Sequence, residues 1–97
     1  MADFAPAHPG EVLLEDFLKP LGMSQYALAK AIGVPQIRVS EIVRATRSVT
    51  PDTALRLARY FGTSAEFWMG MQATYDLETA RDQMGAEIDR TVAPRAA

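Results

Sequence analysis

Residues 25–44, QYALAKAIGVPQIRVSEIVR, decide the fold of this 97-residue chain. Each half carries apolar or small side chains at helical spacing: Leu28, Ala29 and Ile32 in the first, and either Ile37 or Val39, then Ile42 and Val43, in the second. Gly33 lies between the halves, where the chain needs a positive φ that glycine adopts at no steric cost. Pro35 suits the first turn of the second helix, where its missing N–H would have no partner. The stretch therefore predicts two short helices at a tight turn, as in a DNA-binding helix-turn-helix.

The flanking sequence predicts three further helices. The first begins at His8-Pro9-Gly10-Glu11 and should end at Lys19-Pro20, because the residue before a proline is disfavoured in the α region. Thr50-Pro51-Asp52 starts another, which Gly62 closes. Thr63-Ser64 should cap the last, which we expect to end near Met84.

These elements predict an all-α, five-helix domain with a central helix-turn-helix and a C-terminal helix that extends into a dimer interface. We expect residues 1–8 to form a flexible arm, residues 9–84 the DNA-binding and dimerisation domain, and residues 85–97 a frayed tail.

Charge is distributed unevenly along the chain, whose formal net charge is −2. Residues 1–29 sum to −3, residues 30–59 to +4 and residues 60–97 to −3. A basic middle is the footprint expected of a surface that meets phosphates, because local potential matters more there than total charge. Chance clustering on a solvated helical surface would produce the same pattern.

Several functional classes are disfavoured by what the sequence lacks. There is no cysteine, and the N-terminus has no signal-peptide pattern, so we expect a cytoplasmic protein without disulfides. His8 is the only histidine, and no Gly-rich phosphate loop is present, so we expect neither catalysis, metal nor cofactor. We interpret His8 as a residue of the first helix start.

From Pro9 to Arg81 the chain resembles HigA-type antitoxins, part of the Xre-like group of helix-turn-helix regulators. The segments that carry the resemblance are HPGEVLLEDFLKPLGMS, AKAIGVP, RVSEI, TPDTALRLARYFGTSAEFWM and MQATYDLETAR. The resemblance implies a lambda-repressor-like homodimer that represses its own promoter and neutralises a small basic, mRNA-cleaving toxin of RelE-like fold. The chain departs from the family after the second motif helix, where Arg44-Ala45-Thr46-Arg47 replaces a frequent Asn-Gly-Lys.

A helix-turn-helix inserts the N-terminal end of its second helix into the major groove. There Gln36 can pair with adenine, Ile37 can contact a thymine methyl, and Arg38 can bind either guanine or a phosphate. The full set of predicted DNA contacts is Ser24, Gln25, Gln36, Ile37, Arg38, Ser40, Glu41, Arg44 and Arg47. Gln36 and Ser40 could instead be ordinary exposed residues. Arg56 and Arg59 fit a solvated face better than a groove contact.

The last predicted helix has more large apolar side chains than one buried stripe can use. We expect Phe67 in the core and a two-fold dimer interface formed by Trp68, Met71, Tyr75 and Leu77. Such a dimer would present two recognition helices to a palindromic operator in double-stranded DNA.

Two alternatives remain open at this point. The chain could be a stand-alone Xre-like transcriptional regulator without a toxin. It could also be a protein-interaction module that has lost DNA binding.

Overall fold

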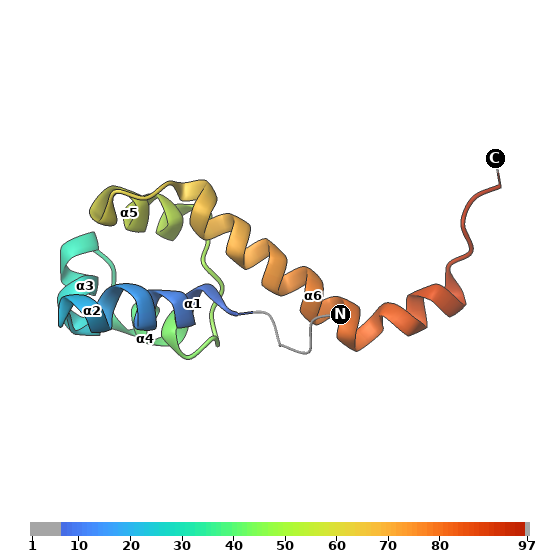
Figure 1. The fold of residues 1–97 in the computed structure, drawn as a ribbon, viewed down its shortest axis with the longest axis horizontal. Coiled ribbons are helices and arrows are strands. Elements are labelled where there is room, and N and C mark those ends of the chain that lie inside the picture. The colour runs from blue at the N-terminus through green and yellow to red at the C-terminus, as the bar shows by residue number, and fades with distance from the viewer. Residues whose placement is uncertain (1–6, 97) are drawn as a thin grey trace.

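Five helices make up the part of the chain that the computed structural model describes, residues 7–96, and no strand occurs among these residues (Figure 1). The elements are α1 (Pro9–Val12), η1 (Leu13–Leu18), α2 (Lys19–Leu21), α3 (Gln25–Ile32), α4 (Gln36–Val43), α5 (Pro51–Phe61) and α6 (Ala65–Thr91). Because α1, η1 and α2 follow one another without a break, they form a single helical segment. The predicted all-α, five-helix fold is confirmed.

The first helical segment continues through Pro20, so the prediction that Lys19-Pro20 ends it is wrong. It reaches Leu21, and Gly22 ends it with a φ of 62°. The turn before the proline is a π-helix, in which the Lys19 N–H donates to the Leu14 carbonyl. This wider turn accommodates a proline ring that would clash with the preceding turn of a regular α-helix.

The predicted helix boundaries hold at most other junctions. Gly33 and Gly62 both adopt a φ of 74° and end α3 and α5. Ser24 and Ser64 cap α3 and α6 by accepting backbone N–H bonds three residues on. Pro35 differs slightly, because it occupies the N-cap of α4 rather than its first turn.

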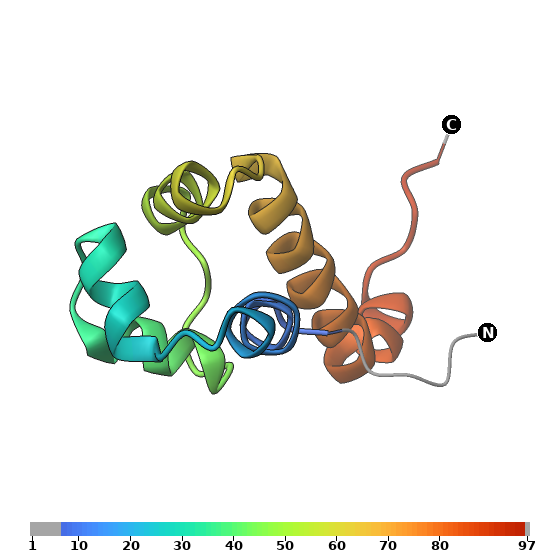
Figure 2. The ribbon, with the colours of Figure 1, turned by 60° about the vertical axis from the view of Figure 1, so that its left-hand side comes forward.

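The first helical segment lies at the centre of the packing, between the α3–α4 pair and α6 (Figure 2). Gly10 makes the closest approach. A Cβ built there would lie 1.7 Å from the Ile42 carbonyl oxygen, so only glycine lets α1 pack against α4.

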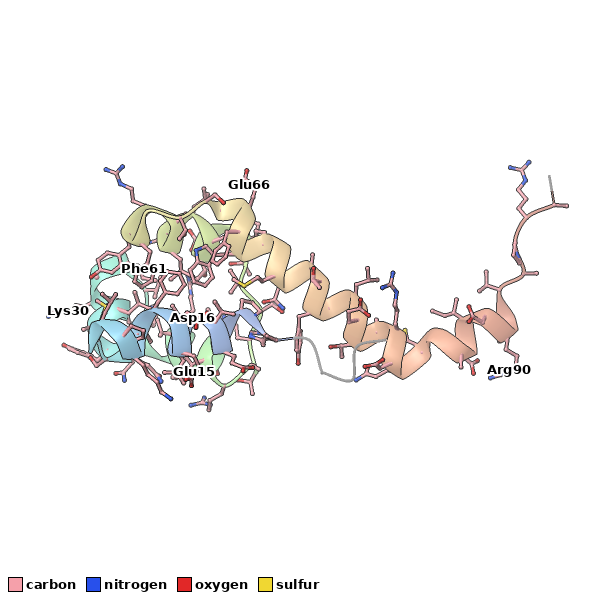
Figure 3. All side chains as sticks on the ribbon, in the orientation of Figure 1. Glu15, Asp16, Lys30, Phe61, Glu66 and Arg90 are labelled. Atoms are coloured by element: carbon pink, nitrogen blue, oxygen red, sulfur yellow. The ribbon has the colours of Figure 1, made fainter. Side chains whose placement is uncertain are left out.

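The core gathers side chains from every helix. Its buried hydrophobic members are Leu13, Leu18, Leu28, Ala29, Ile32, Val39, Ile42, Val49, Ala54, Leu57 and Trp68. Trp68 is fully buried, and its indole N–H donates to the Thr63 hydroxyl at 2.8 Å. Phe17 and Phe61 pack beside it, and Figure 3 shows Phe61 between α5 and the first helical segment.

Helix α6 extends well beyond this core (Figure 1). It ends at Thr91, so the prediction of a helix end near Met84 is wrong. Its length explains the elongated dimensions of 53 × 27 × 22 Å. The predicted arm lies outside the described residues except for Ala7 and His8, and His8 is buried rather than part of a flexible arm. None of the helices described has the length and apolar content needed to cross a membrane.

Candidate nucleic-acid interface

The helix-turn-helix divides α4 into a buried and an exposed face. Val39 and Ile42 are buried against the rest of the core, as predicted. Gln36 and Ile37 lie in the first turn on the other face, and Ile37 is 55% exposed. An exposed β-branched side chain beside an exposed amide at a helix N-terminus can offer a methyl contact and a bidentate hydrogen bond to base edges.

The start of α3 supplies the second part of this surface. Ser24 is exposed, and its hydroxyl accepts from the Ala27 N–H at 3.0 Å, so it caps the helix. Gln25 follows as the first residue of α3 and is half-buried. The capped N-terminus carries a partial positive charge, which favours a phosphate nearby.

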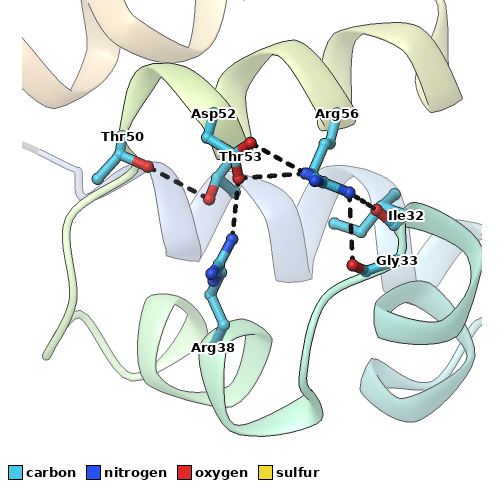
Figure 4. Close-up of polar contacts among 7 residues, drawn as sticks. All are labelled: Ile32, Gly33, Arg38, Thr50, Asp52, Thr53 and Arg56. Carbon is cyan, nitrogen blue, oxygen red and sulfur yellow. Dashed lines mark hydrogen bonds and ion pairs between the residues drawn. The ribbon is translucent and has the colours of Figure 1, made fainter.

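Arg38 points toward the start of α5 (Figure 4). Its Nη1 donates to Asp52 Oδ2 at 3.0 Å. Asp52 also accepts from Arg56 Nε, at 3.1 and 3.2 Å. Arg56 Nη1 in turn donates to the carbonyl oxygens of Ile32, at 2.7 Å, and Gly33, at 3.4 Å. One set of charged side chains therefore connects α3, α4 and α5.

Sequence reasoning missed the role of Arg56. It was expected to be a solvated residue, yet it binds the last carbonyl groups of α3, which have no partner within their helix. The i,i+4 spacing from Asp52 was the available signal, but spacing alone does not reveal a contact with another helix.

Three further predicted DNA contacts make hydrogen bonds or ion pairs within the chain. The Ser40 hydroxyl donates to the Ile37 carbonyl at 3.1 Å. Glu41 accepts from Arg47 Nε at 2.8 Å, and Arg47 Nη2 lies 2.7 Å from the same oxygen. The Glu41 carboxylate therefore partly neutralises the charge of Arg47. Arg44 is exposed at the end of α4.

The exit from α4 keeps a left-handed turn without glycine. Ala45 has a φ of 62°, and it is the one non-glycine residue with positive φ in the described part of the chain. The Ala45 N–H donates to Ile42, and the Thr46 N–H to Glu41, which together form a Schellman motif. Arg44-Ala45-Thr46-Arg47 thus forms a left-handed turn, with alanine in a conformation that is strained for an L-residue.

Helix α6 has a second apolar face on the side opposite Trp68 and Gln72. We call it the outer stripe; its residues are Phe67, Gly70, Met71, Thr74, Leu77, Met84, Gly85 and Ile88. Two hollows of about 350 and 230 Å³ lie along it, one beside Phe67 and Met71 and one beside Leu77 and Ile88.

The outer stripe changes the predicted dimer interface. Trp68 is 0% exposed, so its assignment to the interface is wrong. Phe67, expected in the core, is 40% exposed, because adjacent residues on a helix point about 100° apart. Leu77 is 53% exposed and Met71 half-buried, and both lie on the stripe. Tyr75 is half-buried and packs edge-on against His8, with ring centroids 4.8 Å apart.

Polar contacts of Gln72 connect α6 to the α4–α5 connection, and His8 at the start of the first helix is close enough to Asp76 of α6 to feel its charge. Gln72 accepts from the Val49 N–H at 2.7 Å and donates to Asp76 at 2.9 Å. His8 Nδ1 accepts from the Gly10 N–H at 2.9 Å, so His8 is the N-cap of the helix whose start the sequence placed at this residue. Burial lowers the pKa of His8 below its ordinary value, and the nearby Asp76 charge partly opposes this shift. Within residues 7–96, no three His, Asp or Glu side chains are placed to hold a metal ion.

Comparisons with known proteins agree with this geometry. A family model described as helix-turn-helix matches residues 14–68. Virulence-associated protein I of Dichelobacter nodosus is 58% identical over 75% of this chain and 68% of its own length. Antitoxin HigA-1 of Vibrio cholerae is 35% identical over 84% of this chain and 77% of its own length.

Solved structures extend the likeness to almost the whole chain. Pseudomonas aeruginosa antitoxin HigA with the higBA promoter has a TM-score of 0.91 and 44% identity, covering 94% of this chain and 99% of that one. Antitoxin GraA in complex with its operator has a TM-score of 0.91 and 42% identity, covering 100% and 98%. These relatives are helix-turn-helix proteins rather than enzymes, which confirms that prediction. The chain belongs to the helix-turn-helix family and, within it, to the HigA-type antitoxins.

Proposed function

We propose that this protein is a sequence-specific DNA-binding antitoxin that represses its own promoter. The observation that carries the proposal is the exposed first turn of α4, with Gln36 and Ile37 free of the core. These two side chains would contact base edges in the major groove. Ser24 and Gln25 at the start of α3, together with Arg44, would contact the phosphate backbone.

Other predicted contacts take a smaller part in this proposal. The Ser40 hydroxyl and the Glu41 carboxylate already bind the Ile37 carbonyl and Arg47. DNA would have to displace these partners to bind either side chain. Arg47 would bind a phosphate when the Glu41 pair opens, which is feasible because a half-exposed ion pair is weak.

The protein would act as a homodimer joined through the outer stripe of α6. The stripe combines exposed apolar side chains with two glycines, Gly70 and Gly85, where no atom lies within 4 Å of an added Cβ. A second copy of α6 could therefore approach closely, and a two-fold contact would bury the same stripe on both chains. The two recognition helices would then meet a palindromic operator.

The partner besides DNA would be a small basic toxin of RelE-like fold that cleaves mRNA. The support is the family membership and the likeness to antitoxins HigA and GraA. A stand-alone regulator is the second candidate, because an Escherichia coli relative that is 35% identical is described only as an HTH-type transcriptional regulator.

Binding to the DNA upstream of its own gene tests the proposal. We expect saturable binding whose log K falls linearly with log salt, and preference for this DNA over a scrambled duplex of equal length. Equal affinity for both duplexes would contradict sequence-specific binding. Co-expression with the neighbouring reading frame separates the two candidates, since a toxin partner should co-purify and its growth inhibition should be relieved.

A further inference from the structure

The ion pair with Asp52 holds the Arg38 guanidinium at the start of α5, where it is not available to the proposed DNA surface (Figure 4). Arginine at the N-terminal end of a recognition helix is the side chain that most often contacts guanine, and it also binds any phosphate within reach. Here its guanidinium is directed to the start of α5 instead. A side chain that binds phosphates equally well at every sequence adds affinity without discrimination.

Exposure indicates what this ion pair does and does not do. The Arg38 side chain is 31% exposed and the Asp52 side chain 56% exposed. Ion pairs this accessible contribute little to the free energy of unfolding. Its effect should therefore lie in where it holds the Arg38 side chain rather than in how stable the fold is.

Arg56 and Arg38 both bind Asp52, but they depend on it to different degrees. Arg56 keeps two carbonyl partners on α3 whether or not Asp52 is charged, so it stays in place. Among the described residues, Asp52 is the one hydrogen-bond partner of the Arg38 side chain. Loss of the Asp52 charge would thus release Arg38 alone, next to the exposed turn that holds Gln36 and Ile37.

We infer that Asp52 is a specificity-determining positioning residue: it holds Arg38 away from the DNA backbone and leaves base contact to Gln36 and Ile37. The inference rests on the proposed DNA binding and goes beyond it, because it assigns a role in DNA discrimination to a residue of α5, outside the helix-turn-helix.

Salt titrations of operator and scrambled duplexes test this role with full-length Asp52→Asn, Arg38→Gln and the double variant. Asp52→Asn should steepen the salt dependence by about one phosphate contact and lower the operator-to-scrambled ratio roughly tenfold. Arg38→Gln should leave the slope at the wild-type value, and the double variant should return to it. Asp82→Asn, which removes the same charge from the distal part of α6, is the matched control and should change neither quantity.

The inference is overturned if Arg38→Gln lowers the slope by about one contact, since Arg38 would then already bind a phosphate. An unchanged specificity ratio in Asp52→Asn would overturn it as well. If wild-type protein shows no operator preference, the proposed function fails instead. Thermal unfolding is the folding control: because the ion pair is exposed, the melting temperatures of both single variants should stay close to the wild-type value, and a large loss would contradict a role in positioning rather than in stability.

Discussion

The two halves of α6 differ in what they contact, although they belong to one helix. Residues 65–75 pack against the core and bury Trp68 and Gln72. Residues 77–91 include no buried residue, and their apolar side chains Leu77, Met84 and Ile88 are between 46% and 53% exposed. Figure 3 shows Arg90 at the projecting end. Helices in proteins gain most of their stability from packing, so the exposed apolar side chains of the distal half support the proposed contact with a second copy of the chain.

The largest expected effect tests the packed region. Gly10→Ala would place a Cβ 1.7 Å from the Ile42 carbonyl oxygen. The nearest atoms all belong to the backbone of Ile42 and Val43, so the clash cannot be relieved by a side-chain rotation. We expect the free energy of unfolding to fall by about 3 kcal/mol, as measured by denaturant titration of both proteins at one concentration. Gly85→Ala in the distal half is the control, because nothing lies within 4 Å of its added methyl. A similar loss in both variants would contradict the packing of α1 against α4.

Charges placed on the outer stripe test the distal region. Leu77→Glu combined with Ile88→Glu should weaken dimerisation roughly 100-fold and operator binding with it, because burial of an unpaired carboxylate is unfavourable. Sedimentation measures the first effect and DNA titration the second. Substitutions at Leu77 and Ile88 test the interface more directly than one at Tyr75, because the Tyr75 ring also packs against His8 within the chain. A double variant that remains dimeric at the wild-type concentration would exclude the stripe as the interface.

A smaller effect concerns the turn that follows α4. Ala45→Gly should raise the free energy of unfolding by about 0.5–1 kcal/mol, because glycine adopts the φ of 62° without strain. Denaturant titration measures the change. Ala73→Gly, on an exposed face of α6, should lower stability and serves as the opposite control. Destabilisation by Ala45→Gly would mean that the turn is not left-handed.

The smallest effect depends on pH. Because burial lowers the pKa of His8 in the folded state, the unfolded chain binds a proton first as the pH falls. The stabilisation should be complete above about pH 6.5, the ordinary histidine value, and should decline below it. His8→Asn retains a capping side chain and should flatten the stability profile below about pH 6.5. The same decline in both proteins would assign it to other groups.

The sequence predicted the motif more accurately than the last helix for a physical reason. Gly33, Ser24 and the apolar spacing of α4 act locally, so each left a readable pattern. Phe67 and Trp68 are adjacent aromatic residues, and the positions of α5 and the first helical segment decide which one is buried. The end of α6 could not be predicted either, because residues 85–91 pack against nothing in the part of their own chain that the structure describes and so carry no core-facing apolar stripe.

The candidate site was partly predictable for the same reason. Exposure of Gln36 and Ile37 follows from helical periodicity within α4. The partners of Arg38 and Arg56 lie on other helices, and no short-range pattern specifies them. The π turn before Pro20 also escaped prediction, because the usual rule for proline assumes a regular α-helix.

The most direct test of the account compares Gln36→Ala with wild type on operator and scrambled duplexes at one salt concentration. If the first turn of α4 contacts bases, the variant should lose about 1–3 kcal/mol of operator binding while its affinity for the scrambled duplex stays unchanged. An equal loss on both duplexes, or no loss on the operator, would contradict base contact by this helix.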